Sequence, residues 1–154
     1  MKKSNLLVAT LLLGGGLFSP LTTFAAEVEN VGSDEVQETV AATDLTMAPV
    51  GIGVRDSINL TTTATITMTA NFGNVQGSGK ATKIMDNIYV KARIYNANGV
   101  LGDQKASSQN KTDYHSVKTS NALVSFSKNY GFANATYKKA GYNTVSNETR
   151  VNQK

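Results

Sequence analysis

Residues 86–99 read DNIYVKARIYNANG, and this stretch decides the fold class. Its apolar residues alternate strictly with polar or amphipathic ones, which is typical of a half-buried β-strand. One face carries Ile88, Val90, Ala92 and Ile94. The other face carries Tyr89, Lys91, Arg93 and Tyr95. The closing Asn-Gly dipeptide favours a tight hairpin turn, because both residues tolerate a positive φ. The stretch therefore predicts a strand that leads into an antiparallel neighbour.

The same two-residue period extends in both directions from this strand. Residues 58–70 read INLTTTATITMTA, with apolar side chains on one face and threonines on the other. The glycine-rich residues 71–79 are expected to be a turn or loop, and the polar residues 107–113 a loop. Further strands are expected at residues 100–106, 116–127, 131–138 and 143–151. About seven short strands without helical alternation predict an all-β fold, a single antiparallel β-sandwich with an immunoglobulin-like layout.

The first 26 residues have the three parts of a secretory signal peptide. Lys2 and Lys3 precede an apolar run over residues 6–18, and small residues follow at positions 23–26. Three consecutive glycines and Pro20 interrupt the run, so it is not expected to serve as a permanent membrane anchor. The mature protein is expected to be secreted, either extracellular or loosely associated with the cell wall.

Charge divides the remainder of the chain into two parts. Residues 27–44 contain six acidic and no basic residues, whereas residues 45–154 contain thirteen basic and five acidic ones, a net charge of +8. The acidic part is interpreted as a disordered spacer or as a propeptide that masks the basic domain. A β-sandwich domain is expected over residues 45–154.

Cysteine is absent and His115 is the single histidine of the chain. The sequence therefore excludes disulfides and thiolate metal sites, and it makes a zinc site improbable. No metal and no cofactor is expected. A cysteine-free exported chain is compatible with a Gram-positive bacterium as its source.

A hydrolase is the weakest of three functional hypotheses. Asp113, His115 and Ser116 lie close together in the sequence, but they share one segment and no Gly-x-Ser-x-Gly elbow is present. The protein is accordingly expected not to be an enzyme, with His115 exposed in a loop.

Cations and aromatic rings alternate in residues 128–142, KNYGFANATYKKAGY. Rings stack on sugars and cations attract phosphate, so this region is a candidate surface for an anionic cell-wall polymer or glycan. Nucleic acid is not expected as a partner. The candidate ligand-binding residues are Lys128, Tyr130, Tyr137, Lys138, Lys139 and Tyr142. Strand alternation places Tyr130 and Tyr137 on opposite faces, which means that some of the rings must belong to the core.

The signal peptide, the cysteine-free strands and the segments DNIYVKARIY and YGFANATYKKAGY together resemble small secreted β-sandwich proteins of Gram-positive bacteria without assigned activity. The layout is also similar to that of lactococcin 972-type bacteriocin precursors. The first resemblance assigns no activity; the +8 charge of residues 45–154 favours a non-enzymatic protein that binds at the cell envelope. The second implies a bacteriocin or toxin released from an acidic leader by cleavage near Leu45.

Overall fold

The computed structural model describes residues 26–28, 36–51, 56–69, 71–124 and 128–154. Within these residues the chain forms eight strands and no helix, which confirms the all-β prediction. The strands are β1 (Ala26–Val28), β2 (Gln37–Met47), β3 (Ile58–Met68), β4 (Phe72–Tyr95), β5 (Leu101–Lys118), β6 (Ala122–Leu123), β7 (Tyr130–Lys138) and β8 (Val145–Asn152). All pairings are antiparallel.

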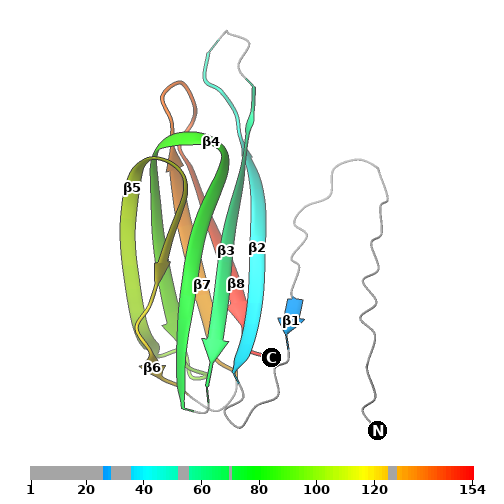
Figure 1. Ribbon diagram of the computed structural model, residues 1–154, viewed down its shortest axis with the longest axis vertical. Helices are drawn as coiled ribbons and strands as arrows, with labels where there is room; N and C mark the ends of the chain where they lie inside the picture. The colour runs from blue at the N-terminus through cyan, green and yellow to red at the C-terminus, as the bar shows by residue number, and fades with distance from the viewer. Residues whose placement is uncertain (1–25, 29–35, 52–55, 70, 125–127) are drawn as a thin grey trace, which may run out of the picture.

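The strands belong to one sheet in the order β1-β2-β3-β4-β7-β8, with β5 and β6 paired to β4. The 24-residue β4 organises this sheet, because its first half pairs with β3 and its second half pairs with β7. The other edge of β4 is followed by β5 along both halves. Strands β4 and β5 therefore bend together, and each of them contributes one half to each of two facing layers (Figure 1).

The bend is made by an irregularity in the pairing of these two strands. Lys80 pairs with Tyr114 and Met85 pairs with Thr112, so β4 contributes more residues to the bend than β5 does. Lys111, beside the bend, has a φ of 52°. Extra residues on one strand of an antiparallel pair bend it and increase its twist.

On the opposite side the sheet nearly closes into a barrel between β2 and β8. Pro49 and Tyr142 form an isolated antiparallel bridge, and the amide of Val50 donates to the carbonyl oxygen of Gly141 at 2.9 Å. Asn147 Nδ2 donates to the carbonyl oxygen of Thr43 at 3.2 Å. A loop bridge and a side-chain hydrogen bond thus replace a continuous backbone ladder at this seam.

The core lies between the two layers, and the predicted faces supply it. Ile88, Val90, Ala92 and Ile94 are all fully buried. In β3 the buried residues include Ile58, Leu60, Ala64, Ile66 and Met68, as the two-residue period predicts. The hairpin turn at residues 96–99 is also confirmed: the amide of Gly99 donates to the carbonyl oxygen of Asn96 at 3.0 Å, and Gly99 has a φ of 81°.

The prediction of a loop at residues 71–79 is wrong, since β4 starts at Phe72. Its glycines mark a close approach of the two layers. A Cβ added to Gly77 would lie 3.0 Å from the Cβ of Ala133, and one added to Gly79 would lie 3.0 Å from the hydroxyl of Tyr137. The glycines therefore serve packing across a thin part of the core and do not mark a turn.

The prediction of a loop at residues 107–113 is also wrong, because β5 runs through it. Among the described strands it pairs only with β4, and most of its side chains are exposed. An edge strand that faces solvent needs no apolar alternation, so its composition is typical of a loop. The strand expected at residues 116–127 reduces to the end of β5 and the short β6, with residues 125–127 outside the described part.

The expectation of disorder over residues 27–44 is wrong for residues 37–44, which form most of β2. Thr39, Ala41 and Thr43 are buried there, and every residue of β2 pairs with β3. The folded domain therefore begins before position 45. The proposed signal peptide lies outside the described residues, apart from Ala26 in β1.

Candidate functional site

The candidate residue Tyr137 belongs to the core and not to a ligand surface. Its side chain is fully buried, and its hydroxyl donates to the carbonyl oxygen of Thr61 at 2.7 Å. The same hydroxyl lies 3.1 Å from Thr62 Oγ1. Burial raises the pKa of the Tyr137 hydroxyl, and the hydrogen bond with Thr62 partly opposes this rise. The neutral Tyr137 hydroxyl, with hydrogen bonds to Thr61 and Thr62, therefore joins β7 to β3.

The other five candidates lie at opposite ends of β7. Lys128 and Tyr130 are at its start, while Lys138, Lys139 and Tyr142 are at its end or beyond it. A nine-residue strand separates the two groups by about 27 Å at ~3.4 Å per residue. The structure therefore does not bring the predicted residues together in one patch.

The later group also has structural partners. Lys139 Nζ donates to the carbonyl oxygen of Ile84 at 2.6 Å, and the Tyr142 hydroxyl donates to the carbonyl oxygen of Asp56 at 3.0 Å. These bonds tie the β7–β8 loop to the segments around it. Lys138 remains exposed on the outer face of β7.

A different cluster forms on the outer face of β4, β7 and β8, and we call it the aromatic–arginine cluster. Its members are Arg93, Tyr95, Tyr130, Phe132 and Arg150. Backbone register places Tyr95 opposite Tyr130, and it places Phe132 between Arg93 and Arg150. All five side chains point away from the core, because their strand neighbours Ile94, Gly131, Ala133 and Val151 are buried.

The rings of this cluster are mutually oriented. Tyr95 and Tyr130 are stacked, with ring centroids 5.1 Å apart and planes 7° from parallel. Phe132 meets both of them edge-on, at 5.9 Å from Tyr95 and 5.8 Å from Tyr130. Offset stacking and edge-to-face contact are the favoured arrangements of aromatic pairs. The cluster is thus built into the sheet before any ligand binds.

The two arginines lie over these rings but differ in their polar partners. Arg93 Nη2 donates to Glu148 Oε2 and to Asn134 Oδ1, both at 2.6 Å. Arg150 lies 4.5 Å from the ring centroid of Tyr130, and its Nε donates to Asn152 Oδ1 at 3.0 Å. Arg150 forms no salt bridge with any residue in the described ranges. Arg93 is therefore neutralised, whereas Arg150 presents its charge to solvent.

The outer faces of the two layers differ in charge. Around the aromatic–arginine cluster, the outward charged residues on β4, β7 and β8 are Lys91, Arg93, Lys138, Glu148 and Arg150. On the opposite layer, the outward charged residues on β2, β3, the first half of β4 and the last part of β5 are Glu38, Asp44, Lys80 and Lys118. The first face has a positive net charge and the second is balanced. Anions are thus attracted to one side of the barrel.

Sequence reasoning identified Tyr130 but missed Arg93, Tyr95 and Arg150 as its neighbours. Arg93 and Tyr95 are on the outward face of the strand quoted first, so their orientation was readable from the alternation. That β7 lies directly beside the second half of β4 was not readable, because β5 and β6 come between them in the sequence.

His115 lies on β5 and not in a loop. Its Nε2 is 2.7 Å from Ser107 Oγ, and its Nδ1 is 3.2 Å from Gln109 Oε1. These bonds join the two arms of the bent strand. The hydrogen-bond partners of His115 within the described chain include neither Asp113 nor Ser116, so the arrangement considered for a hydrolase does not form.

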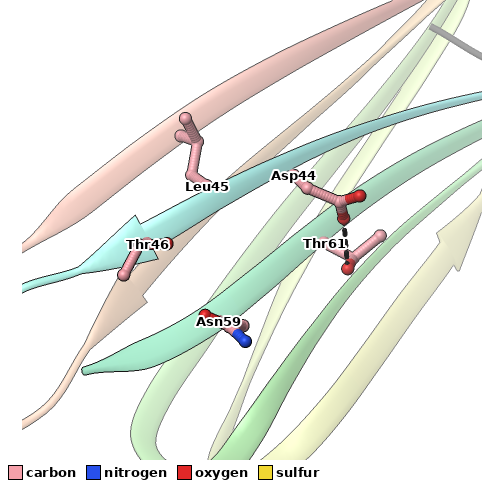
Figure 2. A pocket seen from close by; sticks show the side chains of 5 residues that line it. All are labelled: Asp44, Leu45, Thr46, Asn59 and Thr61. Atoms are coloured by element: carbon pink, nitrogen blue, oxygen red, sulfur yellow. Dashed lines mark hydrogen bonds between the residues drawn. The ribbon is translucent and has the colours of Figure 1, made fainter. Parts of the chain in front are cut away.

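An open pocket of about 390 Å³ lies on the outer side of β2 and β3 (Figure 2). Its lining residues are Asp44, Leu45, Thr46, Asn59 and Thr61. The single carboxylate, Asp44, accepts a hydrogen bond from the hydroxyl of Thr61 at 2.6 Å. One engaged carboxylate without a second acid or a base offers no general acid–base pair.

The part of the chain that the structure describes contains no group of three or more histidine, cysteine, aspartate or glutamate side chains placed to hold a metal ion. Nor does that part contain a helix long and apolar enough to cross a membrane. In comparisons with known proteins, no family model, curated protein or solved structure matches this chain.

Proposed function

We propose that this protein is a secreted, non-enzymatic binding protein that attaches to an anionic polymer of the Gram-positive cell envelope through the aromatic–arginine cluster. The observation that carries this proposal is Arg150. Its guanidinium faces solvent without an acidic partner in the described chain, and it is held over the ring of Tyr130.

The chemistry of the cluster suits a phosphate-rich polymer or an anionic glycan. A guanidinium can bind a phosphate or carboxylate through two parallel hydrogen bonds, and stacking on a ring restricts the side chain before binding. Tyr95, Tyr130 and Phe132 offer apolar surface to the C–H groups of a sugar or polyol. Lys91 and Lys138 extend the positive face along the strands, so a linear polyanion can contact several cations at once.

The test measures retention of the full chain on immobilised heparin and on purified Gram-positive cell wall as the salt concentration rises. Arg150→Gln is expected to elute at lower salt and to bind about two- to fivefold more weakly, the size of one partly screened ion contact. Lys118→Gln removes the same charge from the opposite layer and should elute near the wild type, because a polymer bound at the aromatic–arginine cluster does not contact that layer.

A ring substitution tests the aromatic part of the site. Tyr130→Ala is expected to weaken binding to cell wall at salt concentrations that suppress charge attraction. Tyr114→Ala is its control, since Tyr114 is 47% exposed on the opposite layer. Equal effects of Arg150→Gln and Lys118→Gln would show diffuse attraction and refute the site. No retention at low salt would refute the function.

A further inference from the structure

Exposed apolar side chains gather at the end of the barrel where β4 starts, which we call the Phe72 end. Among the described residues it comprises 69, 71–72, 96–101, 119–124 and 128–130. The exposed fractions there are 48% for Phe72, 60% for Val100, 42% for Leu101 and 74% for Leu123. Burial of apolar side chains away from water is favourable, so their concentration at one end indicates an interaction surface.

Backbone pairing places these side chains at the same level along the barrel axis. Leu123 on β6 pairs directly with Phe72 on β4, and β6 lies at the foot of the barrel in Figure 1. A Cβ added to Gly102 would lie 3.0 Å from the Cβ of Ala122, so the start of β5 packs against β6. The β4–β5 hairpin with Val100 and Leu101 therefore adjoins the Phe72–Leu123 pair.

Cations accompany the apolar residues at this end. Lys118 and Lys128 are exposed and, like Arg150 near the end of β8, form no salt bridge with any described residue. Asp103 is engaged locally, where it accepts a hydrogen bond from the amide of Ser120 at 2.7 Å. The Phe72 end thus combines exposed apolar side chains with the cations Lys118 and Lys128, and Glu38 near the start of β2 is an exposed acid at the same end.

The other end of the barrel has fewer exposed apolar side chains. Among the described residues, its large exposed apolar side chains are Val50 and Ile84. Two of its lysines are paired with acids, whereas Lys138 is exposed and forms no salt bridge with a described residue. Lys83 lies 3.4 Å from Asp56, and Lys111 lies 2.5 Å from Asp86. Both ends therefore carry cations, but exposed apolar side chains are concentrated at the Phe72 end.

Tyr95 and Tyr130 complete the pattern at the Phe72 end. Their stacked rings are at the last residue of β4 and the first residue of β7, one step from the loops that carry the apolar tips. Tyrosine is favoured at the boundary between apolar and aqueous phases, because its ring is apolar and its hydroxyl is polar.

We propose that the Phe72 end docks on the surface of an anionic lipid bilayer. Phe72, Val100, Leu101 and Leu123 enter the boundary between headgroups and acyl chains, while Lys118 and Lys128 contact headgroup phosphates. A lipid surface accounts for the charge and for the spread of the apolar residues over both layers, since a bilayer contacts every side chain at one depth. This inference goes beyond attachment to a polymer. It shares Tyr95 and Tyr130 with the aromatic–arginine cluster, but its four inserted apolar side chains lie outside that cluster.

The test is flotation of the full chain with vesicles of phosphatidylglycerol and phosphatidylcholine, compared with vesicles of phosphatidylcholine alone. Binding is expected to the anionic vesicles. The double variant Phe72→Ser with Leu123→Gln should bind at least tenfold more weakly. The double variant Val50→Ser with Ile84→Gln removes two side chains of 56% and 59% exposure at the other end and should bind as the wild type does. All variants keep the same first 26 residues, so any contribution from these residues is common to them.

Equal binding by both double variants, or equal binding to both vesicle types, would overturn the proposal. Concentration-dependent self-association that only the Phe72 and Leu123 substitutions abolish, without vesicle binding, would instead assign this end to a second copy of the chain. Heparin retention distinguishes the two proposals, because the Phe72→Ser and Leu123→Gln changes should leave it unaltered whereas Arg150→Gln lowers it. Circular dichroism spectra that match the wild type establish that each variant is folded.

Discussion

Tyr137 on β7 and Thr62 on β3 meet inside the barrel, with their hydroxyl oxygens 3.1 Å apart. The Tyr137 hydroxyl also donates to the carbonyl oxygen of Thr61 at 2.7 Å, and Thr149 Oγ1 on β8 donates to the carbonyl oxygen of Thr62 at 2.9 Å. Strands far apart in the sequence are thus fastened by buried polar groups that satisfy one another. These bonds connect the layer of β3 with the layer of β7 and β8.

Replacing Tyr137 with Phe should lower the free energy of unfolding by about 1–2 kcal/mol at neutral pH, because the partner groups of a buried hydroxyl lose their hydrogen bonds. Urea denaturation followed by circular dichroism measures the change. Tyr114→Phe, at an exposed site, provides the comparison and should cost less than ~0.5 kcal/mol. Equal costs for the two variants would contradict the structural role of Tyr137.

The same phenol predicts an alkaline dependence of stability. Burial raises the pKa of the folded-state Tyr137 hydroxyl above its unfolded value of about 10. The unfolded chain then releases this proton first, so stability is full below pH 10 and falls as the pH rises toward the folded-state pKa. The fall between pH 9.5 and 11 should be shallower in Tyr137→Phe than in the wild type, and an unchanged slope would contradict the prediction.

Gly131→Ala should destabilise the barrel by about 1–3 kcal/mol through overpacking. A Cβ at this position would lie 2.3 Å from Val75 Cγ2 and 3.1 Å from the carbonyl oxygen of Arg93. Adding Val75→Ala removes the first clash but not the second, so the double variant should be less destabilised than the two single changes predict together. A double-mutant cycle of unfolding free energies measures this coupling, and strict additivity would contradict it.

Glu148→Gln should strengthen binding to heparin. Glu148 Oε2 accepts hydrogen bonds from Arg93 Nη2 at 2.6 Å and from Asn134 Nδ2 at 2.7 Å, so its carboxylate neutralises one of the two arginines in the aromatic–arginine cluster. Loss of that charge leaves Arg93 available to a polyanion. Elution at higher salt than the wild type is expected, and elution at lower salt would show that the ion pair instead holds the cluster in its binding geometry.

A chain that starts at Leu45 should not unfold cooperatively. It lacks residues 37–44, which pair with β3 and include the buried Thr39, Ala41 and Thr43. A chain that starts at Val36 lacks β1 and no other described strand, and it should keep a sigmoidal thermal transition with little loss of midpoint temperature. Thermal denaturation of both fragments tests this boundary. A cooperative transition for the shorter fragment would restore the propeptide interpretation of residues 27–44.

The sequence by itself determined which side chains lie on the inner and outer faces of the strands. Alternation over residues 58–68 and 87–95 indicated which side chains enter the core, because successive residues of a strand point to opposite sides, with Thr62 as the one polar residue on the inner face of the first segment. It also assigned Tyr130 and Phe132 to one face and Tyr137 to the other, and it located the hairpin at Gly99. The separation of an acidic segment from a basic one was equally visible, although this charge pattern did not reveal that β2 belongs to the sheet.

Only the tertiary structure decided which strands are neighbours. The pairing of β7 with the second half of β4 arises because β4 bends and contributes to both layers, and no local signal encodes such a nonlocal pairing. Glycines at positions 77 and 79 looked like a turn until Ala133 and Tyr137 were placed against them. Local periodicity sets the direction of a side chain, whereas its partners depend on strand order. The aromatic–arginine cluster and the Phe72 end therefore emerged from the closed sheet and not from the sequence.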